Sequence, residues 1–377
     1  MDKTMKVNNR WLLAGLISLA LFSGAAQARQ QWSKQEANDW YQQQPWLLGA
    51  NFTPSTAANQ IEMWHKDTFD IATIDKEMGM AADIGMNTLR VFLHNLVWEN
   101  DREGFNERLE KFLELGDKHN LKVLFVLFDS DWDPNPVYGQ QKPPVPGVHN
   151  SRWVQAPGEQ RLQDKSKYPK LKEYVQDVIG NHANDERVIG WDLWNEPSNT
   201  SAGLYDSIAD KNDYVALLLP QVYDWARSVD PKQPLTTGLW SGAQWDDPDQ
   251  LDEIEKIQVN ESDIISFHDY GWPEEFEARV QQLSSYGRPL IATEYMARGS
   301  GSTFDGTLPM GKKHNVGMFN WGLVDGKTQT RLPWDSWYNP YTEREPTIWF
   351  HEIFHSDGTP YRQAEIDLIK SLSTTNE

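Results

Sequence analysis

Residues 188–197 read VIGWDLWNEP, an apolar run that ends at the carboxylate of Glu196. A second run, PLIATEY at residues 289–295, places Glu294 near its end in the same way. In a (β/α)8 barrel, the strands bury their apolar residues and present their last residues to the active-site face. Two carboxylates placed in this way can act across one sugar-sized gap, one as an acid and one as a nucleophile. The pair therefore predicts a barrel with a two-carboxylate active site.

Short apolar runs alternate with longer amphipathic ones along the chain, which is typical of repeated strand–helix units and a parallel sheet. Eight strands are expected, at residues 46–52, 87–93, 122–129, 188–195, 234–240, 264–270, 289–295 and 316–323. Apolar residues at three- and four-residue spacing predict helices at residues 74–84, 106–119, 168–181, 213–229, 274–286 and 363–372. Eight such units fit a (β/α)8 TIM barrel better than an open sheet.

Three long segments after predicted strands are expected to be loops on the active-site face. They span residues 130–167, 299–308 and 326–345, and the first is rich in proline and glycine. Long loops at this face either wall off one end of a cleft or line an open groove. The sequence therefore leaves open whether a polymer would be cut at its end or internally.

The first 28 residues have the three parts of a secretory signal. A basic stretch is followed by an apolar core at residues 11–22 and by small residues that end at Ala28. We expect cleavage after Ala28, which leaves residues 29–377 as a single catalytic domain that is secreted or periplasmic. The apolar core is too short to span a bilayer, and no later stretch is long and apolar enough to do so.

Composition excludes several classes of function. The formal net charge is −20 at pH 7, which argues against binding to nucleic acid or to anionic membranes. The chain has no cysteine, so disulfides, thiol catalysis and cysteine-ligated metals are excluded. No repeat or appended binding module is visible. We expect a monomer that acts on a neutral substrate.

Cleavage of a glycosidic bond with retention requires two carboxyl groups in different protonation states. Glu196 lies among tryptophan and proline residues, an apolar setting that would raise its pKa and keep it protonated. Arg90, at the end of the second predicted strand, could hold Glu294 ionised, and Tyr270 could donate a hydrogen bond to it. These contexts predict Glu196 as the acid/base and Glu294 as the nucleophile.

The motifs WNEP at residues 194–197 and TEY at residues 293–295 resemble those of the retaining clan-A glycoside hydrolases, most closely family 5, which includes cellulases and mannanases. The resemblance spans nearly the whole mature chain. It implies a (β/α)8 barrel whose acid/base ends the fourth strand and whose nucleophile ends the seventh. It also implies substrate-binding or supporting roles for Arg90, Asn195, His268, Tyr270 and Trp321.

Within this resemblance, Asn195 would bind the substrate 2-hydroxyl, Tyr270 would contact the nucleophile, and Trp321 would stack under the sugar at the cleavage point. One position departs from the family pattern. The family usually carries a histidine after the third strand, where this chain reads FDSDWD at residues 128–133. His94, just after the second predicted strand, could reach a similar place.

Two alternatives belong to other classes of protein. Residues 351–355 read HEIFH, the zinc-protease pattern, but Tyr361 stands where the longer pattern has a third histidine. We therefore expect this segment to be a helix or loop that packs aromatic residues. A non-catalytic carbohydrate-binding barrel would keep the tryptophans, yet it has no reason to keep both glutamates.

The chain has 18 tryptophans. For those in predicted loops, packing and sugar stacking are about equally expected: Trp132, Trp153, Trp240, Trp245, Trp272, Trp334 and Trp337. The sequence as a whole predicts a retaining β-glycoside hydrolase that uses no cofactor and no metal. Its expected substrate is a neutral β-linked glucan, mannan or xylan, or oligosaccharides from one of these.

Overall fold

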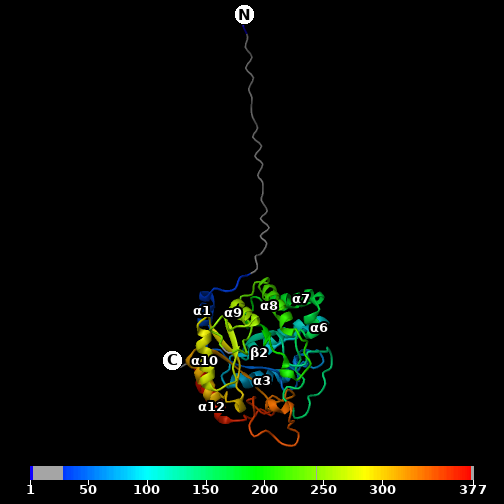
Figure 1. The fold of residues 1–377 in the computed structure, drawn as a ribbon, viewed down its shortest axis with the longest axis vertical. Coiled ribbons are helices and arrows are strands. Elements are labelled where there is room, and N and C mark those ends of the chain that lie inside the picture. Colours follow the sequence, from blue (N-terminus) through cyan, green and yellow to red (C-terminus); the bar gives the residue numbers. More distant parts are fainter. Residues whose placement is uncertain (3–28, 243, 375–377) are drawn as a thin grey trace.

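The computed structural model describes residues 1–2, 29–242 and 244–374. Eight parallel strands form one sheet in the order β5-β4-β3-β2-β1-β8-β7-β6. Helices surround the strands (Figure 1), so the predicted (β/α)8 barrel is confirmed. The strands are β1 (Leu48–Asn51), β2 (Thr88–Phe92), β3 (Lys122–Asp129), β4 (Val188–Asn195), β5 (Leu235–Thr236), β6 (Ile265–His268), β7 (Leu290–Tyr295) and β8 (Gly317–Trp321).

The barrel is least regular between β5 and β6. The expected strand over residues 234–240 is wrong in length, because β5 contains only two residues. Pairing resumes at Leu239, which forms a parallel bridge with Phe267 of β6. Gly238 lies at the interruption, and a Cβ there would be 3.0 Å from Nε2 of His268. The ring of His268 thus fills the space that a side chain of this strand would otherwise need.

The six predicted helices are present within a few residues of their expected bounds, as α3, α5, α7, α8, α10 and α12. Their apolar stripes face the barrel, as the periodicity requires. The helices are α1 (Lys34–Gln42), α2 (Gln60–Trp64), α3 (Ile71–Asp83), α4 (Asn95–Asn100), α5 (Arg102–Lys118), α6 (Glu159–Gln163), α7 (Tyr168–Asn181), α8 (Lys211–Arg227), α9 (Glu253–Glu261), α10 (Pro273–Ser284), α11 (Phe304–Lys313) and α12 (Gln363–Ser373).

The expectation of a loop over residues 299–308 is wrong in its second half, because α11 begins at Phe304. The hydroxyl of Thr303 caps this helix by accepting a hydrogen bond from the amide of Gly306 at 3.3 Å. Pro309 lies inside the helix, and proline and glycine weaken the helical signal of the sequence. Packing against α10 and α12 supports the helix in spite of this composition.

Helix α1 covers the N-terminal end of the barrel. Ala37 and Tyr41 of α1 are buried in one cluster with residues of four strands: Leu124, Ile189, Ile291 and Phe319. The C-terminal ends of the strands face the other way. Figure 1 shows α1 at the upper left and the long segment after β8, in orange and red, at the bottom of the molecule. Side chains at the strand ends therefore meet at the end of the barrel remote from α1.

The predicted secretory signal at residues 1–28 falls on residues 3–28, which lie outside the described part of the chain. Within residues 29–242 and 244–374, no helix combines the length and the apolar character that crossing a bilayer requires.

Candidate active site

The two glutamates of the predicted pair face each other across the mouth of the barrel. Glu196 directly follows β4, and Glu294 lies near the C-terminal end of β7. Both side chains are buried, and a carboxylate oxygen of one lies within 4.8 Å of a carboxylate oxygen of the other. The backbone of Glu196 has a φ of 42°, in the left-handed region, which turns the chain sharply out of the strand. Such strained residues cluster at functional sites.

Arg90 on β2 is fully buried beneath the pair. Its Nη1 donates to Glu294 Oε1 at 2.9 Å and to Asn51 at 2.7 Å. Its Nε and Nη2 donate to Asp192 at 3.0 and 2.8 Å, and Nη2 also donates to Asn195 at 2.6 Å. The guanidinium is therefore held in one orientation, and the expected contact between Arg90 and Glu294 is present.

The other oxygen of Glu294 accepts a hydrogen bond from the hydroxyl of Tyr270 at 2.8 Å, which is also an expected contact. His268 lies between the two glutamates. Its Nδ1 is 2.7 Å from Glu196 Oε1 and 3.6 Å from Glu294 Oε2. Burial lowers the pKa of His268 to about 4, so its imidazole is neutral at pH 7.

The two glutamates differ in the groups that oppose the effect of burial. Burial raises the pKa of Glu196 to about 7, although the amide of Asn199 and the charge of Arg90 act against it. Burial also raises the pKa of Glu294, and the nearby carboxylate of Glu196 adds to this, against the charge of Arg90 and the hydrogen bond from the Tyr270 hydroxyl. The sequence anticipated the apolar setting of Glu196 and the cation beside Glu294. It did not anticipate that Glu294 is also deeply buried.

Two further residues belong to the site, and the sequence analysis did not select them. The side-chain amide of Asn199 donates to Glu196 Oε2 at 2.7 Å and to Asp131 Oδ1 at 2.5 Å. Burial and the neighbouring carboxylates of Glu196 and Asp129 raise the pKa of Asp131 well above its usual range. The only signal for Asp131 in the sequence was its place after the third strand, where the family pattern has a histidine.

The hypothesis that His94 substitutes for this histidine is wrong. Its Nδ1 accepts a hydrogen bond from the amide of Leu96 at 3.1 Å and caps α4, and its Nε2 lies 3.1 Å from the carbonyl oxygen of Gln155. Both ring nitrogens are occupied in the fully buried ring. His94 is therefore a structural residue behind the site.

Asn195 is close to the glutamates, but its polar atoms are already engaged. Its amide nitrogen donates to Asp129 at 3.0 Å and to Asp131 at 3.2 Å, while its carbonyl oxygen accepts from Arg90. The side chain does not line the cavity described below. In this arrangement Asn195 orients Arg90 and Asp131, and its role as a ligand of the 2-hydroxyl stays a prediction.

A cavity of about 310 Å³ opens between the glutamates and is lined mainly by aromatic rings. Trp321 at the end of β8 is one of them, as expected, and Tyr270 is another. Four of the tryptophans in predicted loops also line the cavity: Trp132, Trp240, Trp334 and Trp337. Flat apolar rings with a few convergent polar groups suit a saccharide, whose ring has apolar faces and a polar edge.

The other loop tryptophans lie elsewhere. Trp153 is buried behind Trp321, with 5.8 Å between their ring centroids. Trp245 is buried against Phe267, and Trp272 is 62 % exposed.

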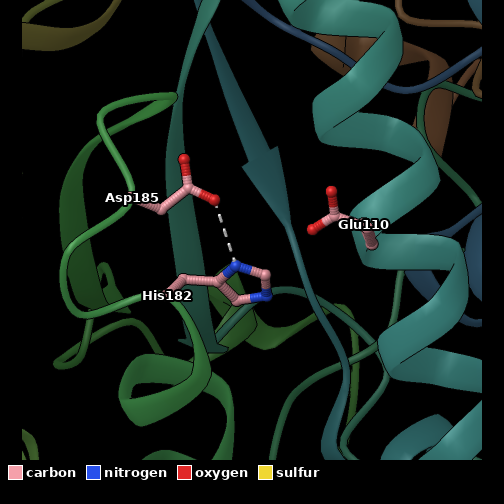
Figure 2. Close-up of side chains that lie close together, drawn as sticks. All are labelled: Glu110, His182 and Asp185. Carbon is pink, nitrogen blue, oxygen red and sulfur yellow. Dashed lines mark hydrogen bonds and ion pairs between the residues drawn. The ribbon is translucent and has the colours of Figure 1, made fainter.

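Two groups of side chains in the described residues have the spacing of metal ligands. One is Glu196, His268 and Glu294, whose four carboxylate oxygens all have protein partners. The other is Glu110, His182 and Asp185 (Figure 2). These two acids are bridged by Arg187, which donates to Glu110 at 2.8 and 2.9 Å and to Asp185 at 2.6 Å. The guanidinium supplies the positive charge at this second group, so the group is an ion-pair network.

The zinc-protease pattern does not form its metal site. Residues 351–355 are not helical, so the two histidines do not share one helix face. Nδ1 of His351 donates to the carbonyl oxygen of Met296 at 2.7 Å, and Glu352 accepts a hydrogen bond from the hydroxyl of Thr330. The expected packing role is present instead, because Trp349 stacks on Tyr361 with ring centroids 4.6 Å apart. His351 also lines the active-site cavity.

The sequence pattern of the cellulase family (glycosyl hydrolase family 5) matches residues 48–339 of the chain. No curated protein matches it by sequence. Among solved structures, it is similar to a variant of a family 5, subfamily 18 protein from Streptomyces cattleya in complex with Manb1-4GlcNAc. The identity is 14 %, over 87 % of this chain and 80 % of that chain, with a TM-score of 0.59.

Two more solved structures have a similar fold. The exo-beta-1,4-mannosidase from Opitutaceae bacterium strain TAV5 is 13 % identical over 87 % of this chain and 59 % of that chain, with a TM-score of 0.57. The endo-1,4-beta-mannanase from Rhizomucor miehei is 12 % identical over 86 % and 97 % of the two chains, with a TM-score of 0.55. At these identities, the likeness shows a shared fold alone.

Proposed function

The chain belongs to glycosyl hydrolase family 5, and from this premise we propose that it cleaves β-glycosidic bonds with retention of configuration. It is a glycosidase that hydrolyses O-glycosyl compounds. The proposal adds the roles of the two glutamates and the class of substrate. Glu196 acts as the acid/base, and Glu294 acts as the nucleophile.

The observation that carries the proposal is the separation of the two carboxylates. Their oxygens approach within 4.8 Å. Retaining glycosidases hold their carboxyl groups about 5 to 5.5 Å apart, whereas inverting ones hold them about 6.5 to 9.5 Å apart to admit a water molecule. The short separation supports direct attack by one glutamate on the anomeric carbon.

The surroundings of each glutamate support its role. With a pKa of about 7, Glu196 can carry a proton near neutral pH and return to that state within one catalytic cycle. Glu294 is oriented by Arg90 at one oxygen and by Tyr270 at the other, so its position is fixed before the substrate enters.

In the first step, Glu196 donates its proton to the leaving oxygen while the bond from that oxygen to the anomeric carbon breaks. Glu294 attacks the same carbon and forms a covalent glycosyl ester. In the second step, Glu196 takes a proton from water, and the water oxygen displaces Glu294 from the anomeric carbon. One glycosidic bond and one water molecule are consumed, and both glutamates return to their starting states.

We propose a neutral β-linked glucan, mannan or xylan, or an oligosaccharide from one of these, as the substrate. The cavity presents tryptophan faces rather than a cluster of cations, which favours an uncharged saccharide over an anionic one. Similar folds occur in proteins named as acting on β-1,4-mannosides, so mannosides are the first compounds to test.

The test is to record the anomeric configuration of the first product by NMR during hydrolysis of aryl β-glycosides. Retention predicts the β-anomer first. The Glu294→Ala variant should lose turnover on every substrate. The Glu196→Ala variant should lose about 10²- to 10⁴-fold on substrates with poor leaving groups, keep activity on good ones, and regain turnover with azide.

Glu107→Ala, at an exposed carboxyl on the outer face of α5, is the matched control and should behave as the wild type. An α-anomer as the first product, or full activity of Glu196→Ala on polysaccharide, would show that the assignment is wrong.

A further inference from the structure

Two long loops meet over one side of the active site. The β3 loop (residues 130–158) follows β3, and the β8 loop (residues 322–362) follows β8. Backbone hydrogen bonds join them from Asn150 to Thr328 at 2.7 Å and from Tyr341 to Gly147 at 2.8 Å. The approach is close, because a Cβ on Gly147 would be 2.6 Å from the backbone of Tyr341. We call this junction the loop seam, formed by residues 145–150 and 328–341.

Side chains reinforce the loop seam. The amide nitrogen of Gln329 donates to the carbonyl oxygens of Val145 and Val148 at 2.8 and 3.0 Å, and its oxygen accepts from the amide of Gly147 at 3.1 Å. The imidazole of His149 donates from Nδ1 to the carbonyl oxygen of Leu332 at 2.8 Å. His149 is buried, so the seam is a packed junction rather than a pair of touching surface loops.

The segment after β1 fills the space behind the loop seam. The side-chain amide of Asn59 donates to the carbonyl oxygen of Arg152 in the β3 loop at 2.8 Å. The amide of Lys327 in the β8 loop donates to the carbonyl oxygen of Ser55 at 2.9 Å. The two loops are therefore both hydrogen-bonded to a third segment, the one after β1.

The cavity has a blind side where the loop seam lies. β1 and β2 stand between β3 and β8 in the sheet. Neither these two strands nor the segments after them contribute a described residue to the cavity lining. All described lining residues come from β7, from β8 or from the segments after β3, β4, β5, β6 and β8. Trp153 and Phe92 pack behind Trp321 and leave only a small cavity there, of about 20 Å³.

A linear saccharide bound at the cleavage point extends from it in two directions. The leaving group must lie beside the acid, Glu196 on the β4 side, and the sugar that is attacked lies over Trp321 on the β8 side. The loop seam lies in the direction beyond Trp321, and its loop-to-loop backbone hydrogen bonds have no counterpart between the described residues after β5 and those after β6. The direction beyond Trp321 is the one in which the non-reducing part of a chain would continue.

Resting on the proposed function, we propose that this site is an exo-acting pocket that accepts the non-reducing end of a β-linked chain. It releases a mono- or disaccharide at each turnover and does not cut within the chain. The residues at the loop seam, above all Gln329, set this mode of action, because they remove the space that further sugars would need.

The test uses mannohexaose, cellohexaose and xylohexaose labelled at the reducing end. Exo action predicts that the labelled product shortens in steps of one or two sugars from the non-reducing end. It also predicts that blocking the terminal hydroxyl of the non-reducing sugar by methylation stops cleavage. Labelled fragments of middle length at the earliest time points, or cleavage of the blocked chain, would overturn the proposal.

A variant with a weakened loop seam tests whether the seam causes the exo mode of action. Gln329→Ala removes three hydrogen bonds of the seam and should raise the share of internal cleavage at least about 10-fold, while hydrolysis of an aryl β-glycoside persists. Gln221→Ala, which removes a comparable bond to Leu217 on the outside of α8, is the control. An unchanged cleavage pattern in Gln329→Ala would refute the role of the seam.

A binding measurement separates this proposal from the catalytic one. The Glu294→Gln protein should bind the hexaose that is methylated at its non-reducing end at least about 10-fold more weakly than the unmethylated hexaose. Equal binding of the methylated and unmethylated hexaoses would overturn the proposal of an exo-acting pocket, even if the protein turned over no substrate. If the first product has the inverted configuration but methylation of the non-reducing end still weakens binding, only the assignment of the two glutamates is wrong.

Discussion

Glu352, the acid of the zinc-protease pattern, gives a prediction whose size follows from its burial. The side chain is 1 % exposed, with one oxygen hydrogen-bonded to Thr330 and the other without any partner. It faces a small cavity behind Trp321, and a Cβ on Gly322 would be 2.7 Å from the unpaired oxygen. Burial raises the pKa of Glu352 from 4.5 to about 8.

The sign of the effect follows from proton binding. The unfolded chain releases this proton near pH 4.5, whereas the folded protein holds it until about pH 8, so the folded state binds more protons in between. The free energy of unfolding therefore has its full value below pH 4.5 and decreases as the pH rises to about 8. A difference of about 3.5 in pKa corresponds to a loss of roughly 5 kcal/mol.

Glu352→Gln removes the titration and keeps an oxygen that accepts from Thr330. The free energy of unfolding of the variant minus that of the wild type should rise by roughly 4 kcal/mol between pH 4.5 and pH 8.5. Any constant cost of burying the amide cancels in this slope. Urea unfolding followed by circular dichroism at a series of pH values measures it. Glu343→Gln, at an exposed carboxyl, is the control and should follow the wild type. Parallel curves for Glu352→Gln and the wild type would refute the reasoning.

Three predictions concern the catalytic site and the ion network. Burial raises the pKa of Glu196 to about 7, so kcat/KM on substrates with poor leaving groups should fall about tenfold per pH unit above pH 7. A kcat/KM that stays constant up to pH 8.5 would contradict this. Tyr270→Phe removes the 2.8 Å hydrogen bond to Glu294, so we expect a kcat about 10- to 150-fold lower and an unchanged melting temperature. An unchanged kcat would argue against a role of this hydrogen bond in turnover. Because Arg187 already bridges the acids of the group formed by Glu110, His182 and Asp185, a strong chelator should change neither activity nor melting temperature. A loss of activity in the chelator that added zinc restores would disprove this.

The juxtaposition of the two glutamates could be predicted from the sequence because it depends on local pattern. An apolar run that ends in a carboxylate identifies a buried strand, and parallel strands in a barrel all present their last residues at one face. Glu196 and Glu294 therefore had to lie together once the strands were counted, and so did Arg90, Tyr270 and Trp321, which lie within, just after and at the end of other strands. Their mutual contacts add detail to an arrangement that the periodicity already implied.

Several parts of the site could not be predicted in this way. Asp131, Asn199 and His149 lie in segments without periodicity, so no local pattern indicates where their side chains point. The interruption of β5 at Gly238 depends on the ring of His268, which lies on another strand. α11 is helical in spite of a proline at its centre, because its neighbours support it.

The sequence by itself determined the barrel, the places of the two glutamates and the class of chemistry, because these follow from strand period and from residue types at strand ends. Only the tertiary structure decided how the mouth of the barrel is shaped. The loop seam joins Gly147 to Gln329, residues 182 positions apart, through a hydrogen bond from a loop backbone amide to the Gln329 side chain, which no local sequence pattern indicates. Such contacts form only when the barrel brings the ends of β3 and β8 to the same face. The sequence therefore left open whether the cleft is a groove or a pocket, and the fold joins two distant loops at one side of it.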